Sequence, residues 1–464
     1  MIIQVADTNY ALYAERVKMY NGSIYKGNNP KACVITFGCQ QNEADSERIK
    51  GIVTDMGYSL SSSYSECDLI IVNTCAIRAH AEDKALSLVG NFKALKKKNP
   101  DLIVGICGCM CAEAQTAKKI KNDFHFVTFT LEPNSIHLIP ELVFKGLEEK
   151  KRSYIIGVDK GDIVEGLPAV RKDRHRAWVS IMYGCNNFCA YCIVPYVRGR
   201  ERSRSSSVII SECRELVKCG VKEITLLGQN VNSYKSDLDF AGLIESIALI
   251  EGDFIIRFMT SHPKDVSERL ISVLGKYNGK IAPYFHLPLQ SGSNSILKLM
   301  GRTYTREGFL TTVEKLRKAV PDIALSTDVI VGFPTETERD FEDTLEVLKI
   351  AKFDMGYSFI YSLREGTAAS KMDGQIPEAV KKERMNKLLV LQDEIALEKN
   401  LPYLNKTVRV LVDSVSEKDG KTVYNGRTDT NKLVHFTSDS TLNFDFYNVK
   451  IIKVAAYDLI GVAD

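Results

Sequence analysis

Several hallmarks of other protein classes are missing from this sequence. No stretch approaches the ~20 consecutive apolar residues that cross a membrane as a helix. The first residues have neither the basic start nor the apolar block of a secretory signal. We therefore expect a cytosolic protein with no membrane partner. The 464 residues carry a net charge of only +3, so any affinity for nucleic acid must come from local patches of positive charge.

Internal repeats and low-complexity segments are also absent. A content of 45% hydrophobic and 26% charged residues is typical of an ordinary globular protein. Cysteine, by contrast, is plentiful, with twelve residues. In a reducing compartment these cysteines are poor candidates for disulfides, and some of them are expected to ligate metal.

The tightest cysteine cluster is Cys185-Asn-Asn-Phe-Cys189-Ala-Tyr-Cys192, which follows an apolar run at residues 178–182. A structural zinc site normally has four protein ligands, and no second Cys or His pair follows nearby. Three thiolates suit instead a 4Fe–4S cluster that leaves one iron without a protein ligand. An open coordination position is where a metal site does chemistry. A structural zinc knuckle, or three buried cysteines, is the alternative interpretation.

Three further cysteines each follow a predicted strand near the N-terminus. The strands cover residues 32–37, 69–73 and 102–107, and the cysteines are Cys39, Cys75 and Cys109. Because the carboxyl ends of parallel strands converge on one edge of a sheet, the three thiols are expected to meet there and to hold a second cluster. Helices that follow would favour the thiolate form. Ordinary buried cysteines are the alternative, and Cys107 and Cys111 compete for the third place.

The pattern of apolar residues predicts an α/β protein in several parts. Strands alternate with helices in two regions, and the second has six such units, too few for an eight-stranded barrel. Short β-branched runs split by Gly, Asn and Asp then predict a small antiparallel β-barrel. The expected parts are a polar N-terminal extension without periodicity (1–30), an α/β parallel-sheet domain (31–150), a linker (151–175), a partial (β/α)6 barrel (176–400) and the β-barrel (401–464).

The spacing C-x3-C-x2-C, with Tyr191 before the last cysteine, resembles the signature of the radical S-adenosylmethionine enzymes. The resemblance implies that Cys185, Cys189 and Cys192 bind a 4Fe–4S cluster whose open iron chelates S-adenosylmethionine. An electron from this cluster then cleaves S-adenosylmethionine to give a 5′-deoxyadenosyl radical. In such enzymes the cofactors carry out the chemistry, and the protein orients them toward the substrate and excludes competing reactions.

Other segments resemble one branch of that superfamily, the methylthiotransferases, which have two clusters. Phe37-Gly-Cys-Gln-Gln-Asn42, Val72-Asn-Thr-Cys-Ala-Ile-Arg78 and Gly108-Cys-Met110 are similar to the three-cysteine N-terminal domain of that family. This resemblance implies that Cys39, Cys75 and Cys109 bind an auxiliary 4Fe–4S cluster. Similarity continues through residues 226–231, 286–293 and 328–335, and the final barrel resembles the RNA-binding TRAM domain.

Five residues are predicted to contact S-adenosylmethionine. Glycine permits close approach of the backbone to a ligand, and side-chain amides can hydrogen-bond to it. Turns at strand ends need such residues for structural reasons as well. The five candidates, which all lie near predicted strand ends of the partial barrel, are Gly228, Gln229, Asn230, Ser291 and Asp328.

The segment 426–436 is similar to one typical of the tRNA-modifying members. The resemblance therefore implies insertion of a methylthio group at carbon 2 of an isopentenylated adenosine beside the tRNA anticodon, with two molecules of S-adenosylmethionine. The implied partners are the anticodon stem-loop of tRNA, an electron donor such as flavodoxin or ferredoxin, and a sulfur donor. The alternatives are a threonylcarbamoyl-adenosine or a ribosomal-protein aspartate as the target, or a non-catalytic iron–sulfur sensor that binds RNA.

Positive charge is concentrated around the first cysteine motif. Residues 171–204 contain eight Lys or Arg against two acidic residues, a patch that could contact tRNA phosphates. A solvated charged surface is the alternative. The C-terminal barrel has eight basic and eight acidic residues, so RNA would have to be recognised there by shape or by stacking on aromatic side chains. Tyr424 and Phe436 are the candidates, and core packing is the favoured alternative for Phe436.

Overall fold

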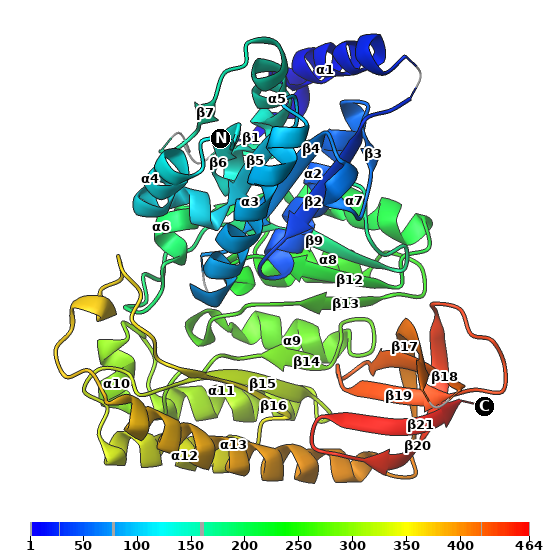
Figure 1. Ribbon diagram of the computed structural model, residues 1–464. Coiled ribbons are helices and arrows are strands. Elements are labelled where there is room, and N and C mark those ends of the chain that lie inside the picture. Colours follow the sequence, from blue (N-terminus) through cyan, green and yellow to red (C-terminus); the bar gives the residue numbers. More distant parts are fainter. Residues whose placement is uncertain (1, 27, 77–78, 158–161, 419, 464) are drawn as a thin grey trace. The chain divides into compact units, whose positions relative to one another are not determined.

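The computed structural model describes residues 2–26, 28–76, 79–157, 162–418 and 420–463 (Figure 1). The chain forms two compact units, which are described separately. The first contains Met1–Lys172, Met182–Asn186 and Cys192–Arg204, and the second contains Asp173–Ile181, Asn187–Tyr191 and Ser205–Asp464. Among the helices of the described residues, none is long and apolar enough to span a membrane.

The first unit is built on a six-stranded parallel sheet, with the strand order β3-β2-β4-β5-β6-β7. Since β3 lies on one side of β2 and β4 on the other, the chain reverses direction across the sheet between β2 and β4. The predicted strands are confirmed to within one residue at each end. The strands are β2 (Lys31–Thr36), β3 (Ser59–Leu60), β4 (Leu69–Thr74), β5 (Ile103–Gly108), β6 (Phe129–Leu131) and β7 (Ser153–Tyr154).

Helices bury both faces of this sheet. One core combines alternate sheet residues such as Leu69 and Ile71 with α1, α2 and α5. The other combines the intervening residues Ile70 and Val72 with α3 and α4. Every residue of β4 and β5 is buried, as expected of strands that are covered on both faces, and both strands are mostly apolar. The helices are α1 (Tyr10–Tyr25), α2 (Gln40–Asp55), α3 (Ala79–Lys98), α4 (Ala114–Asp123) and α5 (Ile139–Glu148), with a 3-10 turn η3 (Cys109–Ala112) after β5.

The N-terminus differs from the expected extension without periodicity. Helix α1 buries Tyr10, Ala14, Val17 and Asn21, which share one helical face. Because Tyr10 is amphipathic and Asn21 is polar, the hydrophobic residues of this segment do not repeat with the period of a helix. Asn21 instead donates its side-chain amide to the backbone oxygen of Met56, at 3.0 Å. The expected linker also carries a strand, β8 (Ile163–Glu165), which pairs in parallel with β1 (Ile2–Gln4); residues 158–161 of that linker lie outside the described residues.

The second unit contains the predicted partial barrel. Its six strands form two three-stranded parallel sheets, β13-β12-β9 and β14-β15-β16. An isolated bridge pairs Ile256 of β13 with Ile281, which precedes β14. The strands are β9 (Arg176–Ser180), β12 (Glu223–Leu227), β13 (Ile255–Phe258), β14 (Tyr284–His286), β15 (Ala324–Val331) and β16 (Met355–Ile360). The helices are α7 (Ser206–Lys218), α8 (Phe240–Ala248), α9 (Glu268–Lys276), α10 (Asn294–Leu299), α11 (Arg306–Ala319), α12 (Glu338–Ala351) and α13 (Glu378–Asn400).

A closed five-stranded barrel ends the chain. Its strands are β17 (Thr407–Lys418), β18 (Lys421–Thr428), β19 (Leu433–Thr437), β20 (Phe446–Val454) and β21 (Asp458–Ala463). Four of the five pairings are antiparallel, as predicted, but β19 and β21 are parallel. Tyr424 and Phe436 are 3% and 1% exposed in the core of this barrel. Core packing of Phe436, the favoured alternative, is therefore confirmed, and the prediction that Tyr424 stacks on RNA bases is wrong.

Residues of the segment 426–436 attach this barrel to the rest of the second unit. The Arg257 guanidinium on β13 donates to the backbone oxygens of Thr428 and Asp429, at 2.8 and 3.0 Å. Lys432 Nζ lies 2.8 Å from Asp354 Oδ1, and both side chains are buried. The segment that resembles the tRNA-modifying members therefore has a structural role in docking the barrel.

Candidate metal centres and active site

The first group of candidate ligands lies where the sheet of the first unit changes direction. Cys39 follows β2, Cys75 follows β4 and Cys109 follows β5, and these three strands are neighbours in the sheet. Open α/β sheets bind ligands outside the carboxyl ends of their strands, at such a reversal point. Cys39 is also the N-cap of α2, so it lies beside the positive end of the helix dipole.

The three thiols are close enough to affect one another. The pKa of the Cys109 thiol is raised to about 11. Burial is the largest cause, the Arg198 guanidinium opposes it, and the neighbouring thiols of Cys75 and Cys39 add to it. Electrostatic effects of this kind require proximity. The structure therefore gathers Cys39, Cys75 and Cys109, as the strand order predicts.

Two glycines allow this close approach. A β-carbon added at Gly38 would lie 2.9 Å from the Cys75 Cβ and 2.9 Å from the Asn42 Cγ. One added at Gly108 would lie 2.3 Å from the backbone oxygen of Thr74. Both glycines also have positive φ angles, of 143° and 97°, which other residues rarely adopt. Glycine before Cys39 and before Cys109 is thus a steric requirement of this site.

A buried arginine, which sequence analysis assigned to a surface patch, completes the group. Arg198 is 3% exposed at the end of α6 (Val194–Arg198). Its Nε donates to Cys109 Sγ at 3.0 Å, and its Nη2 donates to Asn42 Oδ1 at 3.2 Å. Its Nη1 lies 3.0 Å from Asp45 Oδ2. Its position six residues after Cys192 is the only signal in the sequence, and that signal does not point to the first unit.

The two competing cysteines, Cys107 and Cys111, lie in the hydrophobic cores on the two faces of the sheet. Cys107 on β5 belongs to the core with α1, α2 and α5, and burial raises its pKa well above the usual range. Cys111 belongs to the opposite core, where its thiol donates to the backbone oxygen of Ile106 at 3.4 Å. Cys109 packs instead with residues of α6. This arrangement supports Cys109 as the third ligand.

The donor set of this site fits an iron–sulfur cluster. Thiolates are the ligands of 4Fe–4S clusters, and three of them leave one iron open. Among the described residues, no three His, Cys, Asp or Glu side chains are gathered tightly around one point, as a single ion would need. A cluster needs a wider spacing, because each cysteine binds a different iron. Cys39, Cys75 and Cys109 are the ligands that we expect to hold it.

The second group of candidate ligands lies in the loop after β9 and β10 (Met182–Tyr183). Within the first unit, the backbone nitrogen of Cys185 donates to the oxygen of Gly199 at 3.1 Å. Within the second unit, Arg302 Nη1 donates to Cys189 Sγ at 3.3 Å, and Arg302 is 8% exposed. Cys185 and Cys189 are buried and Cys192 is partly buried. The loop thus follows the first barrel strand, as predicted, and Arg302 is a second arginine that sequence reasoning missed.

The predicted cofactor contacts after β12 have one suggestive feature. Gly228, Gln229 and Asn230 directly follow this strand. Asn230 is 1% exposed, and its Nδ2 donates to Asp265 Oδ2 at 2.8 Å. Its Oδ1 is buried and has no hydrogen-bond partner among the described residues. A buried acceptor of this kind is satisfied by a ligand that donates a hydrogen bond, as the amino group of S-adenosylmethionine would.

The other two predicted contacts are placed differently. Ser291 is fully buried, and its Oγ accepts from the backbone nitrogen of Ser293 and lies 3.4 Å from Thr344 Oγ1, so its hydroxyl stabilises the fold. Asp328 lies inside β15, which continues to Val331, and not at the strand end. Its Oδ2 is 3.4 Å from His286 Nε2 on the neighbouring strand β14.

Several basic side chains of the expected patch at residues 171–204 form hydrogen bonds or ion pairs with acidic residues of the same protein. Arg204 makes two hydrogen bonds to Glu165, at 2.7 and 2.8 Å, and both residues are buried. Arg171 pairs with Glu47, and Arg198 is buried as described above. Lys172, Arg174 and Arg200 are the exposed basic residues of the segment. Three of the eight basic residues are therefore exposed, and the contact with tRNA phosphates stays a prediction for these.

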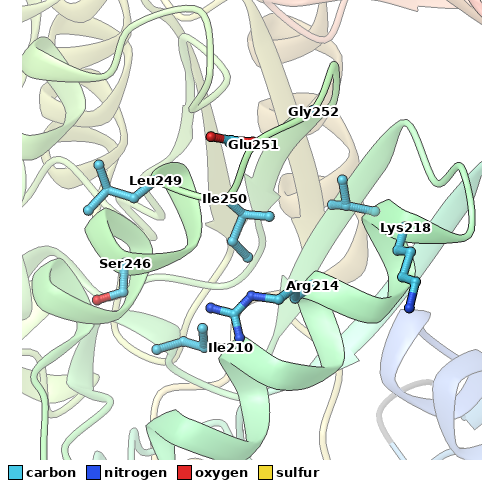
Figure 2. Close-up of a pocket in the computed structure, with 9 residues that line it drawn as sticks. Ile210, Arg214, Lys218, Ser246, Leu249, Ile250, Glu251 and Gly252 are labelled. Carbon is cyan, nitrogen blue, oxygen red and sulfur yellow. The ribbon is translucent and has the colours of Figure 1, made fainter.

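The surface also has a groove of about 760 Å³ between α7 and the end of α8 (Figure 2). Ile210, Arg214 and Ser246 line it, together with residues 249–252. None of the candidate cysteines or cofactor contacts lies among its lining residues. The groove therefore does not belong to the candidate active site.

Two family models match this chain. The model described as "Radical SAM superfamily" matches residues 179–348, which include the Cys185–Cys192 loop. The model described as "Uncharacterized protein family UPF0004" matches residues 31–131, which include Cys39, Cys75 and Cys109. The two matches fall on the two groups of candidate ligands.

Solved structures are similar in fold alone. The radical S-adenosylmethionine methyltransferase TsrM from Kitasatospora setae has a TM-score of 0.55 at 12% identity, over 74% of this chain and 75% of that one. The cobalamin-dependent S-adenosylmethionine radical enzyme OxsB has a TM-score of 0.51 at 12% identity, over 79% of this chain and 56% of that one.

Curated relatives are similar over nearly the whole length. The tRNA-2-methylthio-N(6)-dimethylallyladenosine synthase of Alkaliphilus oremlandii is 48% identical, over 96% of this chain and 94% of the relative. The protein of the same name from Caldicellulosiruptor saccharolyticus is 46% identical, over 97% and 96%. With both cysteine groups present and this level of identity, the chain belongs to the tRNA-2-methylthio-N(6)-dimethylallyladenosine synthase family of radical S-adenosylmethionine enzymes.

Proposed function

We propose that this protein inserts a methylthio group at carbon 2 of an adenosine in tRNA that already carries an isopentenyl (dimethylallyl) group on N6. The adenosine is the one beside the anticodon. The printed names of relatives that are 45–48% identical over nearly the full length support this reaction. They favour it over a threonylcarbamoyl-adenosine or a ribosomal-protein aspartate as the target.

The placement of Cys39, Cys75 and Cys109 directly after three adjacent parallel strands is the observation that carries the proposal. A radical enzyme that only abstracts hydrogen needs one cluster, which the Cys185–Cys192 loop can hold. A second set of three thiols is needed when the reaction also delivers sulfur.

The reaction fits two such groups of ligands. Carbon 2 of adenine carries no acidic hydrogen that a base could remove, so the C–H bond requires a radical route. When bound, one cluster with S-adenosylmethionine supplies the radical, and the other holds the sulfur that a second S-adenosylmethionine methylates. Cys185, Cys189 and Cys192 would hold the former cluster, and Cys39, Cys75 and Cys109 the latter. The unpaired Asn230 Oδ1 would accept from the cofactor and orient it.

The partners follow from the chemistry. The substrate is the anticodon stem-loop of isopentenylated tRNA. An electron carrier such as flavodoxin or ferredoxin must supply the reducing electron, and a separate sulfur donor must replace the sulfur consumed in each turnover. We place the enzyme in the cytoplasm. In support, none of the twelve cysteines forms a disulfide.

Single substitutions of Cys39, Cys75 and Cys109 by Ala test this function. We expect each to abolish the methylthio nucleoside while 5′-deoxyadenosine formation with dithionite continues. Mass spectrometry of tRNA nucleosides from a complemented deletion strain gives the first result, and chromatography of the purified enzyme's products gives the second. Cys111→Ala is the matched control, because this thiol lies in the hydrophobic core, and it should retain both activities.

Two outcomes would contradict the proposal. Methylthio product that persists in Cys75→Ala would show that the second site is not needed. Absence of S-adenosylmethionine cleavage by the reconstituted parent protein would favour the non-catalytic RNA-binding sensor instead.

A further inference from the structure

Arg198 brings a permanent positive charge to the site of Cys39, Cys75 and Cys109. Its guanidinium has three neighbours: Cys109 Sγ at 3.0 Å, Asn42 Oδ1 at 3.2 Å and Asp45 Oδ2 at 3.0 Å. Arginine stays charged even when buried, and burying a charge is costly unless it is paired. A positively charged donor beside a thiol also makes a stronger hydrogen bond than a neutral donor. Asp45 pairs with one edge of the guanidinium, and Nε is directed at the Cys109 sulfur, so a thiolate there would be a second anionic partner.

A cluster bound by three thiolates would be that anion, and its negative charge increases by one when it accepts an electron. A nearby positive charge stabilises the reduced form more than the oxidised form. Hydrogen bonds to the ligand sulfurs act in the same direction and are known determinants of cluster potential. Both effects raise the reduction potential.

We propose that Arg198 is a positioning residue that holds the Cys109 sulfur by an N–H···S hydrogen bond and raises the reduction potential of the cluster bound by Cys39, Cys75 and Cys109. This inference rests on the proposed function, since it needs a cluster at this site. Asp45 partly compensates the guanidinium charge and so limits the effect. Removing Arg198 and removing the charge of Asp45 must then shift the potential in opposite directions.

The chain offers an internal control. Arg302 in the second unit donates from Nη1 to Cys189 Sγ at 3.3 Å, from Nη2 to the Pro288 oxygen at 3.1 Å and from Nε to Tyr304 Oη at 2.9 Å. It is buried like Arg198 but contacts a cysteine of the other group. Each arginine should therefore affect the cluster of its own group only.

The test is a one-electron redox titration with dithionite, followed by electron paramagnetic resonance of the reduced cluster. It uses the full-length reconstituted protein with Cys185, Cys189 and Cys192 replaced by Ala, so that only the second cluster can contribute. R198M should lower the affinity of the cluster for an electron at least tenfold compared with the same protein that keeps Arg198. This corresponds to a shift of the reduction potential by 59 mV in the negative direction. D45N should shift it to more positive potential, and R302M should leave it unchanged.

A loaded R198M protein with the parent potential would overturn the inference, and so would a D45N shift that is absent or negative. If R198M cannot hold iron, D45N still decides the question. In the complementary background, with Cys39, Cys75 and Cys109 replaced by Ala, R302M should shift the remaining signal and R198M should not. The protein in which only Cys185, Cys189 and Cys192 are replaced by Ala also tests the proposed function. If it binds no iron with Arg198 intact, no second cluster exists and the proposed function fails. Iron that binds with an unchanged potential in R198M would overturn the role of Arg198 alone.

Discussion

Glycine 38 controls how closely the first two cysteine segments approach each other. Gly38→Ala would force a methyl group against the Cys75 Cβ and the Asn42 side chain. We expect this substitution to impair the second cluster selectively, so that iron after reconstitution falls from about eight toward about four per chain. Iron and sulfide analysis measures this loss.

Gly90→Ala is the matched control for Gly38→Ala. Gly90 lies in α3, and an added β-carbon would meet no atom within 4 Å. The substitution should therefore keep the full iron content and stabilise the helix by up to about 1 kcal/mol. Equal iron content in the two variants would contradict the steric role of Gly38.

Individual residues differed in how well the sequence predicted them. Cys39, Cys75 and Cys109 stand out in the sequence because each follows a predicted strand of one parallel sheet, and Cys185, Cys189 and Cys192 stand out because of their tight spacing. Arg198 and Arg302 do not stand out, because an arginine in a charged segment usually lies at the surface. Ser291 and Asp328 were placed near strand ends, but the first is enclosed by backbone and Thr344, and the second pairs with His286.

At the scale of elements, the ion pair of Lys432 and Asp354 connects the C-terminal barrel to β16 and its neighbours. Removing one partner leaves the other charge buried, so Lys432→Met should destabilise the second unit by about 3–5 kcal/mol. Adding Asp354→Asn should recover part of this loss. Urea unfolding of the two single variants and the double variant measures the coupling, and strictly additive effects would show that the pair does not act as a unit.

Elements were predictable where their apolar pattern was simple. Strands β2, β4 and β5 are mostly apolar and were located to within one residue at each end. Helix α1 was missed because its buried face includes Tyr10 and Asn21.

At the scale of the whole molecule, positive charge available to tRNA is scarcer than the sequence suggests. Of the basic residues between positions 171 and 204, Lys172 and Arg174 are exposed and lie outside the cysteine sites. Replacing both by Ala should weaken tRNA binding and reduce the slope of log affinity against log salt by about one for each phosphate that the variant no longer neutralises.

Filter binding over a range of salt concentrations measures that slope. Arg339→Ala on α12 is the control, since Arg339 is also exposed but faces Glu342 and Asp343. Its slope should equal that of the parent protein. A double variant of Lys172 and Arg174 with the parent slope would mean that tRNA phosphates are neutralised elsewhere.

Residues 192–204 fold with the first unit although they follow the radical-enzyme motif in the sequence. They bring Arg198 to Cys109, and their Gly199 oxygen accepts a hydrogen bond from the Cys185 nitrogen. A chimera that transplants only residues 31–131 from another methylthiotransferase would therefore combine one parent's thiols with the other parent's guanidinium. Successful recombination within this family should require that the graft also carries residues 182–186 and 192–204.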